Sequence, residues 1–151
     1  TRKTTPNFRI AEKWAVEIGG GTNHRFGLYD MVILKDNHID FAGGVTKALR
    51  STKSYLEKSK KKLKIEIEVR SLQELKEVIK EGGVERIMLD NMIPSQIRQG
   101  IAMIDGKYET EASGGITEMT ISEIADTGVD YISVGALTHS YKSLDMSLKA
   151  I

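Results

Sequence analysis

The sequence contains no cysteine, which excludes disulfides and thiol catalysis and permits a reducing compartment. It also lacks any apolar run near the roughly 20 residues needed to cross a bilayer, and it shows no signal peptide. We therefore expect a cytoplasmic protein with no membrane partner. Neither charge is in excess: 22 basic and 21 acidic residues leave a net charge of +1, which provides no field for binding nucleic acid.

The chain begins at Thr1, without an initiating methionine, on the charged motif Thr1-Arg2-Lys3-Thr4-Thr5-Pro6. This start is typical of the interior of a protein, so we expect residues 1–151 to be one domain of a longer chain. A length of 151 residues is enough for one domain with its own core.

Five short segments have the composition of buried strands. They are residues 30–35, 64–69, 86–90, 108–112 and 130–134. The last four begin at intervals of 22 residues, which indicates a repeated structural unit.

Helical patterns separate these strands. Ser71 and Glu74 form a capping box ahead of an apolar stripe that stops at Gly82-Gly83, and Pro94 suits the first turn of the next helix. A third helix is predicted to begin at Thr117, and a longer one to run from about Gly44 into the lysine cluster.

Strict alternation of strand and helix predicts βαβ units, and hence a parallel sheet with right-handed crossovers. A 22-residue step is short for a doubly wound sheet and natural for a barrel. The favoured fold is therefore a (β/α) barrel, with an open parallel sheet as the alternative.

Polar residues and glycines gather at the carboxyl ends of the predicted strands, the face on which parallel barrels form their active sites. They are Lys35, Glu68, Asp90, Ser113-Gly114-Gly115 and Gly135. Solvation alone does not explain this placement on five successive strands, so the sequence predicts a site there.

Two glycine turns within this set predict a phosphate site. Ser113-Gly114-Gly115 lies between a strand and a helix, where backbone N–H groups and a helix N-terminus can hold phosphate. Gly135 repeats the arrangement on the next strand. A plain tight turn is the alternative for either one.

The acids Glu68 and Asp90 have two interpretations. They could form a salt bridge with Lys35 or Arg25, or they could hold ribose hydroxyls and a Mg²⁺ ion. Glu66 is expected on the same face, one layer deeper, as a structural ion-pair partner.

Cations are concentrated near the start of the chain and on the first strand. The group comprises Arg2, Lys3, His24, Arg25 and Lys35. Their convergence would require a strongly anionic ligand, such as a dicarboxylate together with a pyrophosphate, because guanidinium groups suit bidentate carboxylate contacts. His38 and His139 are interpreted as structural, and no spacing of His, Cys or Asp supports a zinc site.

Seven motifs, in order along nearly the whole chain, resemble the quinolinate phosphoribosyltransferase family. The motifs are Thr1–Pro6, Gly19-Gly20-Gly21-Thr22-Asn23-His24-Arg25, Leu34–His38, Ile67-Glu68-Val69, Leu89–Met92, Ser113–Ile116 and Gly135–His139. One departure is Asn7, where the family commonly has Gly; little effect is expected.

This resemblance implies an incomplete (β/α) barrel of the type II phosphoribosyltransferase kind, without the family's N-terminal α/β sandwich domain. It also implies at least a homodimer, whose site is completed by a basic residue from the partner's N-terminal domain. This chain alone is then expected to bind poorly or to be inactive.

The resemblance further assigns roles to individual residues. Arg2, His24 and Arg25 would bind the two carboxylates of quinolinate; Lys3 and Lys35 would lie near the pyrophosphate, and Lys3, Lys35 and His24 are the catalytic candidates. Glu68 and Asp90 would engage ribose and Mg²⁺, and Ser113, Gly114, Gly115 and Gly135 the 5′-phosphate of phosphoribosyl pyrophosphate.

The implied reaction is phosphoribosyl transfer to quinolinate with loss of CO₂, which gives nicotinate mononucleotide for NAD biosynthesis. Three alternatives stay open: a transferase for nicotinate or another aromatic acid, an aldolase-type barrel with Lys35 as Schiff base, and a phosphate- or nucleotide-binding module without catalysis.

Overall fold

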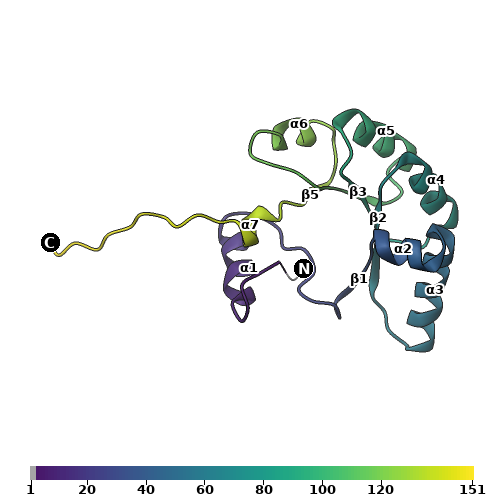
Figure 1. The fold of residues 1–151 in the computed structure, drawn as a ribbon, viewed down its shortest axis with the longest axis horizontal. Helices are drawn as coiled ribbons and strands as arrows, with labels where there is room; N and C mark the ends of the chain where they lie inside the picture. The colour runs from purple at the N-terminus through teal and green to yellow at the C-terminus, as the bar shows by residue number, and fades with distance from the viewer. Residues whose placement is uncertain (1–2) are drawn as a thin grey trace. The chain divides into compact units, whose positions relative to one another are not determined.

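The computed structural model describes residues 3–151, which form two compact units that are described separately here (Figure 1). The larger unit, Gly27–Val134, holds every strand of the described chain. Its strands are β1 (Met31–Leu34), β2 (Lys64–Val69), β3 (Arg86–Asp90), β4 (Glu109–Ser113) and β5 (Tyr131–Ile132). Its helices are α2 (Asp36–Ala42), α3 (Val45–Lys58), α4 (Leu72–Glu81), α5 (Pro94–Ile104) and α6 (Ile121–Ala125).

All five strands are parallel and lie in their order along the chain, β1-β2-β3-β4-β5. In this unit the helices follow the outer side of a curved sheet (Figure 1). A doubly wound sheet would reverse its strand order, and this one does not. The predicted incomplete barrel of α/β units is therefore confirmed.

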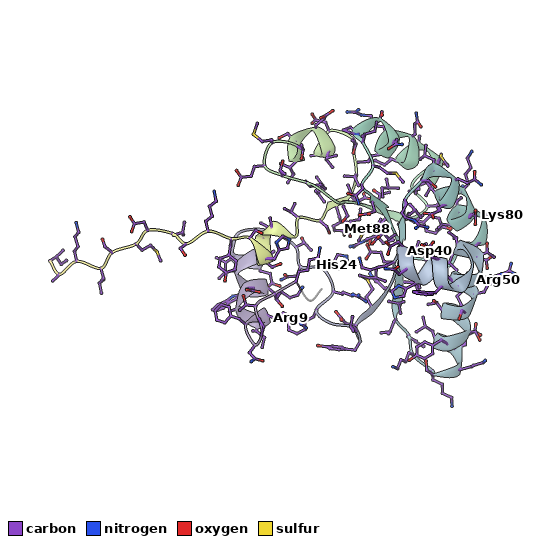
Figure 2. The ribbon with its side chains drawn as sticks, in the orientation of Figure 1. Arg9, His24, Asp40, Arg50, Lys80 and Met88 are labelled. Atoms are coloured by element: carbon purple, nitrogen blue, oxygen red, sulfur yellow. The ribbon has the colours of Figure 1, made fainter. Side chains whose placement is uncertain are left out.

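The two faces of the sheet differ sharply in polarity. Ile67, Val69, Ile87 and Leu89 are fully buried in the apolar core shared with the helices. Because side chains alternate along a strand, the residues between them point to the opposite face. That face carries acids and a base, among them Glu66, Glu68, Arg86, Asp90 and Glu111. In Figure 2, Arg50 and Lys80 lie on the outer helical side, whereas Met88 lies with the sheet.

Three of the four predicted helix starts are confirmed, among them that of α3 after Gly44, and one is wrong. Ser71 Oγ accepts the N–H of Glu74 at 3.2 Å, and α5 begins at Pro94. Glu74 reaches back to the N–H of Arg70 rather than to that of Ser71, at 2.7 Å. The helix expected from Thr117 begins only at Ile121, because residues 117–120 form a turn in which Thr120 Oγ1 accepts the Thr117 N–H.

The smaller unit combines the chain up to Phe26 with Gly135–Ile151. It contains α1 (Arg9–Ile18) and the single-turn α7 (Ala136–His139), which contact each other. Neither helix was predicted from the sequence, nor was α2. Residues 140–151 form neither helix nor strand (Figure 1). Their side chains are exposed.

Within residues 3–151, none of the helices combines the length and the apolar character that crossing a bilayer requires.

Candidate functional site

The larger unit places four of the predicted site residues at the carboxyl ends of adjacent strands. Lys35 directly follows β1, Glu68 lies near the end of β2, and Asp90 and Ser113 close β3 and β4. Asp90 and Ser113 are register partners in the sheet. The strand-end clustering predicted from the sequence is thus confirmed for these residues.

Lys35 and Glu68 form an ion pair. Lys35 Nζ lies 2.9 Å from Glu68 Oε2; 53% of the lysine side chain is exposed but only 9% of the glutamate side chain. The backbone N–H of Lys35 donates to His38 Nδ1 at 2.9 Å, which fixes the start of α2 and supports a structural role for His38. A buried carboxylate therefore holds an exposed ammonium group at the edge of the sheet.

The Ser113-Gly114-Gly115 turn has the backbone shape expected of an anion-binding loop. Gly114 has φ +93° and Gly115 φ +63°, a conformation that side chains with a Cβ rarely adopt. Consecutive glycines of this kind expose backbone N–H groups that can hold phosphate. Because α6 starts only at Ile121, any phosphate contact depends on these glycines and not on a helix that begins at Thr117.

Below this edge the sheet carries a buried ionic cluster that sequence reasoning missed. Arg86 donates to Glu109 Oε2 at 2.8 Å and to Glu111 Oε2 at 3.1 Å, and Ser133 Oγ donates to Glu111 Oε1. The guanidinium carbon of Arg86 lies 3.9 Å from the centre of the Tyr131 ring. The cluster fixes the spacing of three neighbouring strands beneath the site.

Burial of Arg86 by itself lowers its pKa. Hydrogen bonds to Glu109 and Glu111 and the charge of Glu66 raise the pKa by more than burial lowers it, so the pKa of Arg86 lies above its ordinary value. Glu66 is fully buried and influences Arg86 electrostatically, as expected of a structural partner one layer deeper than Glu68. The sequence signal for this cluster was the alternation of charged residues in β4, Glu109-Thr110-Glu111.

In the smaller unit, two buried charged residues of α1 hold the predicted binding motifs. Glu12 accepts hydrogen bonds from the backbone N–H and the hydroxyl of Thr5, at 3.0 and 2.6 Å. Lys13 Nζ donates to the carbonyl oxygens of His24 and Arg25, at 3.0 and 3.1 Å. Both motifs are thus tied to α1, and the sequence analysis identified neither Glu12 nor Lys13.

The loop that carries His24 and Arg25 is ordered by local contacts. Arg25 N–H donates to His24 Nδ1 at 2.8 Å, and Asn23 Nδ2 donates to the Lys13 carbonyl at 2.8 Å. At Gly21 a Cβ would lie 2.9 Å from Val16 Cγ1, so the loop needs glycine where it leaves α1. The prediction that this backbone bends sharply to aim its side chains agrees with this geometry.

Lys3, Gly135 and His139 lie together in the smaller unit. A Cβ on Gly135 would be 2.8 Å from His139 Nε2 and 3.9 Å from Lys3 Cδ. Lys3 and His139 also line an open hollow of about 630 Å³, together with Thr4, Thr5, Thr138 and Tyr141. A cation, an imidazole and threonine hydroxyl groups around a hollow suit an anionic ligand. Arg2 lies outside the described residues, and the convergence of all five predicted cations stays a prediction.

Residues 1–149 match the model of a family described as quinolinate phosphoribosyl transferase, C-terminal domain. A relative from Nicotiana glauca, quinolinate phosphoribosyltransferase [decarboxylating] 2, is 50% identical over 163 residues, which cover 99% of this chain and 46% of the relative. A Bacillus subtilis relative, probable nicotinate-nucleotide pyrophosphorylase [carboxylating], is 45% identical over 98% of this chain and 50% of its own.

Two solved structures are also similar to this chain. NadC from Streptococcus pyogenes has a TM-score of 0.91 and 49% identity, over 99% of this chain and 51% of that one. Nicotinate-nucleotide pyrophosphorylase from Francisella tularensis has a TM-score of 0.89 and 44% identity, over 97% of this chain and 51% of that one. The chain thus spans about half the length of the relatives that it matches.

Proposed function

Since this chain belongs to the quinolinate phosphoribosyltransferase family, we propose that it is the catalytic barrel part of an enzyme that makes nicotinate mononucleotide from quinolinate and phosphoribosyl pyrophosphate. The observation that carries the proposal is the cluster of Lys35, Glu68, Asp90 and the Ser113–Gly115 loop at one edge of the parallel sheet.

This edge suits the phosphoribosyl donor. The carboxylates of Glu68 and Asp90 accept hydrogen bonds from the ribose hydroxyls, and the backbone N–H groups of Gly114 and Gly115 bind the 5′-phosphate. The Gly135 turn adds to the phosphate contacts. Lys35 is exposed and close to Glu68, so its ammonium group can pair with the pyrophosphate of the same donor.

The donor set of this edge fits Mg²⁺. Protein sites for this ion commonly use one or two carboxylates and leave the remaining positions to water and substrate phosphates. Glu68 and Asp90 supply two carboxylates; Lys35 engages one oxygen of Glu68 and Asn91 engages one oxygen of Asp90. When bound, the ion neutralises charge on the pyrophosphate.

The acceptor is assigned to the basic motifs of the smaller unit. Arg2, His24 and Arg25 bind the two carboxylates of quinolinate, and Lys3 lies by the reacting centre. Arg25 offers a planar guanidinium that can contact a carboxylate through two hydrogen bonds. Lys13 supports this role because it holds the carbonyl groups of both His24 and Arg25.

The chemistry then needs position and charge rather than a protein nucleophile. The pyridine nitrogen attacks the anomeric carbon as the bond to pyrophosphate breaks, and the pyrophosphate leaves with the electron pair. Lys3 and Lys35 stabilise this leaving group. The cationic ring accepts the electrons of the adjacent carbon–carboxylate bond, CO₂ departs, and a proton takes its place on the ring.

The test is product formation with different acceptors. The chain, together with the half that it lacks relative to its relatives, is incubated with phosphoribosyl pyrophosphate, Mg²⁺ and either quinolinate or nicotinate, and nicotinate mononucleotide is separated by chromatography. Of the two acceptors, only quinolinate should give product.

The other outcomes distinguish the alternatives. Product only from nicotinate indicates the nicotinate-type transferase, and binding of phosphoribosyl pyrophosphate without its consumption indicates a binding module. A Lys35 adduct that borohydride traps with a carbonyl substrate indicates the aldolase-type barrel.

The assembly is part of the same proposal. At least a homodimer is expected, in which a basic residue of the partner completes the site, and a cytoplasmic location is expected. The Nicotiana glauca relative is named as mitochondrial, and this label belongs to that protein.

A further inference from the structure

Asn91 lies between the two halves of the predicted donor site, and no role has been assigned to it above. It directly follows β3, and its φ of +52° is in the left-handed region. Among residues with a Cβ, asparagine tolerates this conformation best, because its short amide can make local hydrogen bonds. The backbone therefore turns abruptly next to Asp90.

The backbone of Asn91 is tied to the phosphate loop. Its N–H donates to the carbonyl oxygen of Ser113 at 2.8 Å. This bond extends the register in which Asp90 pairs with Ser113, so the turn after β3 and the turn after β4 are held side by side.

The side chain of Asn91 contacts both turns. Nδ2 donates to Asp90 Oδ2 at 2.6 Å, which restrains the rotation of that carboxylate. The same amide group covers Gly114: a Cβ placed there would lie 2.5 Å from Asn91 Cγ and 2.9 Å from Nδ2. Gly114 is therefore required for two reasons, its φ of +93° and the amide packed against it.

From these contacts we infer that Asn91 is a positioning residue that fixes the distance between the ribose-binding carboxylate of Asp90 and the phosphate loop at Gly114. This inference rests on the proposed function, because it assigns ribose to Asp90 and phosphate to the loop. Its consequence is selectivity: a ligand that spans both groups, such as ribose 5-phosphate, depends on Asn91, whereas inorganic phosphate does not.

Two substitutions separate the contacts of the side chain. Asn91→Gly removes the amide but adopts φ +52° without strain, so folding is preserved. Asn91→Asp keeps the shape that covers Gly114 but replaces the Nδ2 donor with an acceptor beside Asp90. Gln73→Ala removes an exposed amide on α4 and serves as the matched control.

Calorimetric titration of each variant, assembled with the half that the chain lacks relative to its relatives, tests the inference; the ligands are ribose 5-phosphate and, separately, inorganic phosphate. Loss of a hydrogen bond to a charged group predicts that both Asn91 variants bind ribose 5-phosphate about tenfold more weakly or worse. In Asn91→Gly, binding of inorganic phosphate should change less than about twofold, as should both affinities in Gln73→Ala. In Asn91→Asp the added carboxylate beside Gly114 repels phosphate, so inorganic phosphate should also bind more weakly in this variant.

An equal loss for both ligands in Asn91→Gly would overturn the inference, because it would show a general collapse of the loop. Unchanged affinity for ribose 5-phosphate in both variants would also overturn it while leaving the proposed function intact. If the unaltered chain binds inorganic phosphate but not ribose 5-phosphate, the assignment of Asp90 to ribose fails, and the inference fails with it.

Discussion

Lys35 has a structural partner in Glu68 and, in the proposed function, a catalytic role. Its pairing with Glu68 confirms the salt-bridge interpretation of that acid. The ammonium group nevertheless remains about half exposed, so it is still accessible to a ligand. Because the carboxylate of Glu68 is buried, the ammonium group of Lys35 also offsets part of the cost of burying that charge.

Substitution of Lys35 tests its catalytic role. Lys35→Ala should lower turnover by two orders of magnitude or more, on the order expected when one preorganised charge that faces the leaving group is lost. The measurement is the initial rate of nicotinate mononucleotide formation by the assembled enzyme. Lys76→Ala, at an exposed position of α4, is the control and should leave the rate unchanged. Near-normal turnover in Lys35→Ala would remove Lys35 from the mechanism.

Substitution of Arg86 tests the buried ionic cluster. Arg86→Met removes the guanidinium but leaves the buried carboxylate of Glu111 in place. Breaking a buried pair on one side costs about 3 kcal/mol or more. Urea denaturation should show this loss, whereas Arg98→Met on the exposed side of α5 should change stability by less than about 0.5 kcal/mol. Equal stability of the two variants would contradict a stabilising role for the cluster.

At the scale of residues, the sequence predicted which side chains cluster when their position in a strand was recognisable. Glu68 and Asp90 stand at the ends of recognisable strands, so their clustering followed from the parallel fold. Lys13 and Arg86 could not be predicted in the same way. Their partners lie 11 to 25 residues away, and only the packed structure shows which groups they reach.

At the scale of elements, the strands were predictable because each is a short run of buried β-branched or apolar residues on the helix side. Helices with a strong local start, such as Ser71 or Pro94, were also predictable. The start of α6 was not, because the Thr120 side chain satisfies the Thr117 N–H in a turn and delays the helix. Such competition between side chain and backbone leaves no trace in apolar periodicity.

The N-cap of α4 gives a direct test of the capping prediction. Ser71→Ala removes the acceptor of the Glu74 N–H and should destabilise the fold by about 1 kcal/mol. Urea unfolding followed by circular dichroism measures the change. Ser71→Asp supplies another good capping acceptor and should restore most of the loss, so equal instability of both variants would contradict the cap.

An ion pair between elements predicts how stability depends on acid. Hydrogen bonds from Arg70 hold the pKa of Asp40 below its ordinary value of 3.8, so the folded state releases this proton more readily than the unfolded state. The resulting stability is present above about pH 4 and is lost as pH falls through the lowered pKa. Asp40→Asn should therefore reduce the loss of thermal stability below about pH 4. Identical acid profiles of the variant and the parent would contradict this linkage.

At the scale of the whole molecule, the chain provides the barrel part of a family whose members are about twice as long. In the proposed function, the edge of the parallel sheet binds the phosphoribosyl donor, and the basic motifs of the smaller unit bind the dicarboxylate. The sequence resemblance identified the family because its motifs are local.

Release of labelled CO₂ from carboxyl-labelled quinolinate tests the proposed activity most directly. The chain is assayed alone and with the half that it lacks relative to its relatives, in the presence of phosphoribosyl pyrophosphate and Mg²⁺. We predict that CO₂ release requires both phosphoribosyl pyrophosphate and Mg²⁺ and is much stronger with the added half. Release should be lost in Lys35→Ala. Absence of release from the folded, assembled protein would contradict the proposed function.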